Sequence, residues 1–166
     1  MKKVLLFIAV AICSISAASA QMTQGDSSIA AKIGFGGGWG VPISVTYENA
    51  LWGINDNSCV TIGGNLSYAG KSYTGFKTTY VFVGARGTYH YAINKWDLFG
   101  GVTLGYDIAS VKWTDEDLKA LGGASASSFD FRFNIGANYY ITEKFAVGAE
   151  YGYGLSPINI GVTYKF

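Results

Sequence analysis

The sequence predicts an all-β fold, a closed eight-stranded antiparallel up-and-down transmembrane barrel with a cleaved N-terminal signal peptide. Three observations lead to this prediction. Apolar and polar residues alternate from residue 29 to the C-terminus, which is the pattern of strands with two unlike faces. Only 14% of the residues are charged while 16% are aromatic, an unusual composition for a surface in water. The 23 glycines are about twice the average frequency.

The start of the chain has the composition of a secretory signal peptide. Two lysines precede the apolar run 4–12, and small residues end in an A-x-A pattern at Ala20. We expect cleavage between Ala20 and Gln21, so that residues 1–20 are the signal peptide and residues 21–166 form one barrel domain. The apolar run is short of the roughly 20 residues that a membrane-spanning helix needs.

The rest of the chain divides into eight alternating segments separated by turn residues. We expect strands at about 28–37, 41–52, 58–69, 77–91, 96–111, 127–140, 145–154 and 158–166. No stretch in this part has the roughly 18 consecutive apolar residues of a spanning helix. If the chain crosses a membrane, it therefore does so with strands.

The connections between the segments alternate in character, as in an up-and-down barrel. Three are short and turn-like, at 53–57, 92–95 and 141–144. The segments 70–76 and 112–126 are longer, and those around 38–40 and 156–157 are very short. Within the longest segment, residues 114–122 depart from the strand period, and a capping threonine and terminal glycine predict a short helix there.

The orientation of the two faces decides between a membrane barrel and a soluble one. A soluble lipocalin-type barrel would turn its apolar face inward and expose lysines and glutamates. The polar face here is instead rich in glycine, which suits a narrow lumen. Aromatic residues also gather at two levels, as in the interfacial girdles of membrane barrels. One level has Tyr89, Tyr91, Trp96, Tyr139, Phe145 and Phe166, and the other has Trp39, Tyr68, Tyr80, Trp113, Phe129 and Tyr153. The apolar face is expected to contact lipid; a β-sandwich with an aromatic core is the other alternative.

Charged residues on the polar face form two sets inside the expected barrel. The lower set lies a few residues from the short turns on four strands and consists of Lys32, Glu48, Arg86 and Glu150. The upper set consists of Asp107, Asp130 and Arg132. Because an isolated buried charge costs several kcal/mol, we expect the lower set to pair in one layer that blocks the lumen. The alternative is a set of separately solvated charges.

The last strand has apolar residues at alternate positions and a final phenylalanine, namely Ile160, Val162, Tyr164 and Phe166. An exported chain of eight alternating segments with this ending resembles the small outer-membrane β-barrel family typified by the OmpA transmembrane domain. The segments 40–45 and 97–102 resemble barrels of Bacteroidetes-type bacteria. The resemblance implies an outer-membrane monomer with both termini in the periplasm, embedded in lipid and lipopolysaccharide. It also implies that the barrel-assembly machinery reads the terminal strand.

Other functions find little support in the composition. Of 12 basic residues two are in the leader, against 11 acidic ones, so the basic surface typical of nucleic-acid binding is lacking. One histidine and one cysteine after the leader do not make a tetrahedral metal site, and no cofactor is expected. His90 precedes the turn 92–95, so we expect it on the periplasmic rim, with Asp97 and Lys165 nearby.

The sequence therefore predicts a non-catalytic barrel with a structural or surface-interaction role in the cell envelope. Eight strands enclose an interior that side chains just fill, so an open pore is not expected. Two alternatives stay open: a lipid-modifying enzyme of the outer membrane, and a narrow ion-conducting channel.

Overall fold

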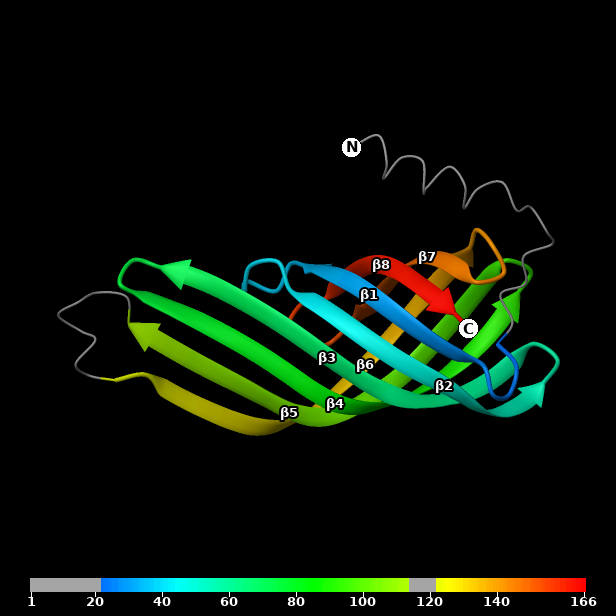
Figure 1. Ribbon diagram of the computed structural model, residues 1–166, viewed down its shortest axis with the longest axis horizontal. Helices are drawn as coiled ribbons and strands as arrows, with labels where there is room; N and C mark the ends of the chain where they lie inside the picture. Colours follow the sequence, from blue (N-terminus) through cyan, green and yellow to red (C-terminus); the bar gives the residue numbers. More distant parts are fainter. Residues whose placement is uncertain (1–21, 114–121) are drawn as a thin grey trace.

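A computed structural model describes residues 22–113 and 122–166 of the chain. Eight antiparallel strands form a closed barrel (Figure 1). They are β1 (Ser27–Phe35), β2 (Ile43–Asn55), β3 (Ser58–Tyr73), β4 (Phe76–Ile93), β5 (Trp96–Trp113), β6 (Ala124–Tyr140), β7 (Phe145–Gly152) and β8 (Ile158–Lys165). Each strand pairs with the next along the chain, and β8 pairs with β1. The predicted fold class is confirmed.

No helix within the described residues is long and apolar enough to cross a bilayer.

Both chain ends of the barrel lie at the same end as the short turns. The backbones of Ser27 and Phe166 exchange two hydrogen bonds, at 2.9 and 2.8 Å. Two residues join β2 to β3 and two join β4 to β5 at this end. Asn94, in the second of these turns, has a φ of 55°, a left-handed conformation that asparagine tolerates. We call this the short-turn end and the opposite one the long-strand end.

The connection between β3 and β4 differs from the prediction. A long loop was expected at 70–76, but the strands run to Tyr73 and from Phe76 and are joined by only Thr74 and Gly75. Gly75 has a φ of 89°, which glycine adopts without the strain that other residues meet. Gly70 and Ser72, which were expected in the loop, continue the sheet instead.

The other connections at the long-strand end differ less. β1 joins β2 through residues 36–42, and β7 joins β8 through residues 153–157. Both are a few residues longer than expected. The helix predicted at 114–122 lies, except for its last residue, outside the described part of the chain.

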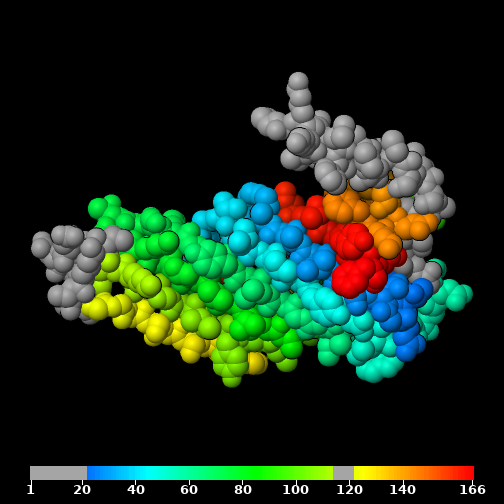
Figure 2. Space-filling view, viewed as in Figure 1, coloured from blue at the N-terminus to red at the C-terminus, as the bar shows by residue number. Residues whose placement is uncertain are grey.

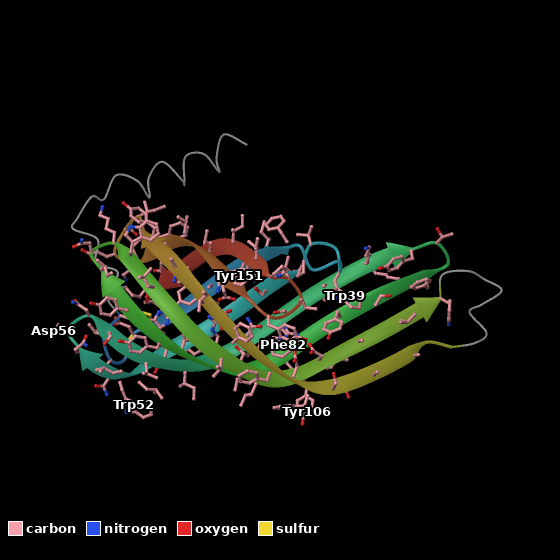
Figure 3. The ribbon with its side chains drawn as sticks, turned by 180° about the vertical axis from the view of Figure 1, so that it is seen from behind. Trp39, Trp52, Asp56, Phe82, Tyr106 and Tyr151 are labelled. Atoms are coloured by element: carbon pink, nitrogen blue, oxygen red, sulfur yellow. The ribbon has the colours of Figure 1, made fainter. Side chains whose placement is uncertain are left out.

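Apolar side chains on the outer face of the strands are exposed, which confirms the predicted orientation. Val45, Leu66 and Val83 are register neighbours on β2, β3 and β4 and are each about half exposed. Figure 3 shows Tyr106 pointing away from the barrel and Phe82 lying inside it. A lipocalin-type barrel or a sandwich would bury the apolar row, so both alternatives are wrong.

The strands form two walls of unequal length. β3 to β6 have 16 to 18 residues, whereas β1, β7 and β8 have 8 or 9. The long strands therefore continue as a four-stranded sheet past the others (Figures 1 and 2). We call this part the extension; it comprises residues 69–73, 76–80, 109–113 and 124–128.

In the extension the outward face becomes polar, and the inward face carries an aromatic cluster. The outward face carries Lys77 and Lys112, which are cross-strand neighbours. The inward face carries Tyr73, Phe76 and Trp113, with ring centroids 4.9 and 5.9 Å apart along the series. Trp113 was expected in an outer girdle, as was Tyr80, and both instead lie on the inward side. A polar outer face indicates that the extension stands in water beyond the apolar belt.

Candidate functional site

The lower charge layer is built from four strands. Lys32 of β1, Glu48 of β2, Arg86 of β4 and Glu150 of β7 meet inside the barrel. Arg86 Nε donates to Glu48 Oε1 at 3.0 Å, and Arg86 Nη2 donates to Glu150 Oε2 at 2.9 Å. Lys32 Nζ donates to the same Glu150 oxygen at 2.6 Å. Arg86 is only 3% exposed. Its positive charge is therefore stabilised by these carboxylates rather than by bulk water.

His90 and Asp97 extend this layer toward the short-turn end. The expectation that His90 is a rim side chain is wrong, because it is 5% exposed and lies in the lumen. Its Nδ1 is 2.9 Å from Asp97 Oδ1, and its Nε2 is 3.7 Å from Glu48 Oε2. Asn138 Nδ2 donates to Asp97 at 3.0 Å. A signal was available, since His90 is four residues from Arg86 and therefore on the same face of β4.

The upper charge layer has its own arginine. Arg132 Nε donates to Asp130 Oδ2 at 2.8 Å, and Arg132 Nη2 donates to Asp107 Oδ1. The Asp130 side chain is 22% exposed, whereas that of Asp107 is 7% exposed. The layer therefore has a buried side and a side open to solvent.

A phenylalanine supports the arginine of the upper layer. Phe82 is fully buried, and Arg132 Cζ lies 3.6 Å from its ring centroid, a close cation–π contact. The ring rests on two paired glycines, Gly84 and Gly105. A Cβ atom at either would come within 2.9 Å of Phe82 Cζ, so a side chain there would displace the ring.

The lower layer repeats this arrangement with Phe99. Arg86 Cζ and Lys32 Nζ lie 5.8 and 5.3 Å from the Phe99 ring centroid. The cross-strand neighbour of Phe99 is Gly136, where a Cβ atom would stand 2.4 Å from Phe99 Cζ. Sequence reasoning missed both phenylalanines. A large aromatic on the polar face among glycines was the available signal.

The lumen narrows from the long-strand end toward the short-turn end. A cavity of about 290 Å³, which we call the vestibule, opens at the long-strand end. Its lining comprises Trp39, Tyr80, Asp107, Ser128, Phe129, Asp130, Arg132, Tyr153, Gly154 and Leu155. A cavity of about 50 Å³ lies between Arg132 and Arg86, and one of about 10 Å³ lies beside His90. The two charge layers separate these spaces.

The lumen groups are arranged for pairing rather than for activating a nucleophile. Both ring nitrogens of His90 face carboxylates, whereas a histidine that activates a hydroxyl or thiol nucleophile must face that group. Within residues 22–113 and 122–166, no group of three or more His, Cys, Asp or Glu side chains is placed to hold a metal ion.

The sequence matches the family of the outer membrane protein beta-barrel domain over residues 5–166. The chain belongs to this family. Membership places this barrel in the outer membrane. No curated protein matches the sequence closely.

Solved structures share the fold of this outer-membrane barrel. The attachment invasion locus protein Ail of Yersinia pestis is 17% identical with a TM-score of 0.54, and the match covers 87% of this chain and 100% of Ail. The N-terminal β-barrel domain of OprF from Pseudomonas aeruginosa gives the same four values. A de novo designed transmembrane β-barrel is 17% identical with a TM-score of 0.53, covering 88% of this chain and 99% of the design.

The structure describes the residues of the predicted assembly signal in the last strand, but not the predicted cleavage site. Ile160, Val162, Tyr164 and Phe166 are all exposed on the outer face of the barrel, and the last two rings stack with centroids 6.1 Å apart. The cleavage site at Ala20 and Gln21 lies outside the described residues and stays a prediction.

Proposed function

We propose that this protein is an outer-membrane barrel with a closed lumen, which serves the envelope in a structural or surface-interaction role and catalyses no reaction. The observation that carries the proposal is Arg86, which bridges Glu48 and Glu150 across the lumen. A pore needs a continuous aqueous path, whereas here two ion-paired layers cross the space between the walls. The surface available for interaction is at the long-strand end.

The sidedness follows from the same proposal. The short turns and both ends of the barrel face the periplasm, and the long-strand end faces outward, as is usual for outer-membrane barrels. The aromatic and lysine-bearing extension then stands above the outer leaflet among lipopolysaccharide. The signal peptide is cleaved after Ala20, and the barrel-assembly machinery recognises the terminal strand that ends in Phe166. The apolar outer surface contacts lipid on all sides in the monomer.

Conductance in planar bilayers tests the closed lumen. We expect the wild-type protein to show no stable open pore. Arg86→Ala removes the bridge of the lower layer, and a double variant with Arg132→Ala also removes that of the upper layer. We expect measurable conductance for the double variant and less for either single variant, because each layer blocks the lumen by itself.

The matched control is Lys77→Ala, which removes a cation from the outward face of the extension and should leave conductance unchanged. A stable open pore in the wild type would disprove the closed lumen and favour the narrow channel. A mass shift of lipid A on expression, abolished by His90→Ala, would favour the lipid-modifying enzyme. Folded protein in each variant is verified by the difference in gel mobility between unheated and boiled samples.

A further inference from the structure

The vestibule holds polar groups that are fixed in place before any ligand arrives. Arg132 is anchored from both sides by Asp107 and Asp130 and from below by Phe82. These contacts hold the guanidinium, which in turn orients the two carboxylates. A carboxylate has about four lone-pair sites, so Asp130 can accept further hydrogen bonds on its exposed side. Ser128 and Tyr80 line the same space.

An aromatic platform stands on the wall of the vestibule. Trp39, from the β1–β2 connection, packs against Tyr80 of β4 with ring centroids 5.1 Å apart and an interplanar angle of 42°. Trp39 is 37% exposed, so part of its ring faces the cavity that it lines. Figure 3 shows Trp39 toward the long-strand end, beyond Phe82.

This combination selects a class of ligand. A sugar ring has an apolar C–H face, which stacks on an indole, and a rim of hydroxyls, which donate to carboxylates. The two aspartates outnumber the one arginine, which disfavours negatively charged sugars such as sulfated or phosphorylated ones. Arg132 already pairs with both carboxylates, so they do not need a cationic ligand. The volume of about 290 Å³ is near the lower end of the range for small-molecule sites. It fits one or two sugar units.

We propose that the vestibule binds an uncharged saccharide of one or two units, stacked on Trp39 and hydrogen-bonded by Asp130. This site goes beyond the proposed function, because a closed structural barrel needs no ligand. Binding in solution does not depend on which side of the membrane the vestibule faces, so its failure and that of the closed lumen are distinguishable.

An NMR titration of the tryptophan indole signals tests the site in the full chain folded in detergent micelles. The probes are the methyl glycosides of glucose, galactose, mannose and N-acetylglucosamine. We expect at least one of them to shift the Trp39 signal in a saturable way, while Trp52 and Trp96 at the other end stay unchanged. Because the site is small and offers few polar contacts, we expect a dissociation constant in the millimolar range, which corresponds to a binding free energy of about −4 kcal/mol.

Matched variants separate the two contacts. Asp130→Asn should weaken binding about tenfold, because hydrogen bonds to a charged acceptor are worth more than those to a neutral one. Asp56→Asn, in the turn at the opposite end, should not. Trp39→Leu removes the platform without touching the ion pairs and should weaken binding several-fold, whereas Trp52→Leu should have no effect.

Several results would overturn the proposal. One is that none of the four glycosides shifts the Trp39 signal. Another is equal affinity in the wild type, Asp130→Asn and Trp39→Leu. A third is a response only to tetramethylammonium, which would make the vestibule a cation site, or only to sucrose octasulfate, which would make it an anion site.

Discussion

The two charge layers of the lumen use the same parts but differ in their contact with water. Each has an arginine between two carboxylates, with a phenylalanine on a glycine surface beside it. In the lower layer Arg86 is 3% exposed, and Lys32 and Thr88 donate further hydrogen bonds to its carboxylates. In the upper layer Asp130 opens onto the vestibule.

The difference in solvent exposure gives the two charge layers different roles, although both consist of an arginine between two carboxylates. A buried set of charges is strongly destabilised when one member is removed, because the others stay unpaired in a medium of low dielectric constant. A set open to solvent loses less, since water replaces the missing partner. The lower layer is therefore the structural closure, and in the upper layer the exposed side of Asp130 is available to a ligand.

The largest expected effect comes from removing the lower arginine. Arg86→Ala leaves Glu48 and Glu150 buried without their bridge and should lower the free energy of unfolding by about 3–5 kcal/mol. Arg132→Ala should cost about 1–3 kcal/mol, because Asp130 is partly hydrated. Urea unfolding in micelles measures both.

A companion variant isolates the cause of this loss. Arg86→Met combined with Lys32→Met, Glu48→Gln and Glu150→Gln removes all four charges of the layer, including that of Lys32, which pairs with Glu150, and should recover most of the stability. Equal losses for Arg86→Ala and Arg132→Ala would contradict the comparison of the layers.

The glycine surfaces should give a smaller effect that is similar in both layers. Gly136→Ala and Gly84→Ala each bring a methyl group against a phenylalanine ring and a neighbouring carbonyl, and overpacking of this kind costs about 1–3 kcal/mol. Gly87→Ala is the control, because a Cβ atom there meets nothing within 4 Å. If Gly136→Ala behaves like the control in urea unfolding, the Phe99 ring is not held by the glycine.

The smallest expected effect is the salt dependence of the coupling energy within each charge layer. A double-mutant cycle between Arg132 and Asp130 should give a coupling of about 0.2–1 kcal/mol. This coupling should decrease between about 0.1 and 1 M salt, where the screening length falls from about 10 to 3 Å. The Arg86–Glu150 coupling should be larger and nearly constant. A salt-sensitive lower coupling would mean that water reaches Arg86.

Local patterns in the sequence predicted most of the barrel. A period of two identifies the strands and assigns each side chain to a face, so Arg86 and Glu150 could be placed in the lumen without any contact being known. The same rule would have placed His90 there, but its closeness to a turn was given more weight. The extension was missed because its outward face becomes polar, which made residues 70–76 resemble a loop.

The sequence by itself determined the number of strands, their faces and the charges inside apart from His90 and Asp97, because these follow from alternation between neighbouring residues. Only the tertiary structure decided which acid meets which base. Glu150 joins both Lys32 and Arg86, although these residues come from strands far apart in the chain. Their meeting depends on the register and stagger with which eight strands close, and no local pattern specifies those. The unequal walls and the vestibule arise from the same closure.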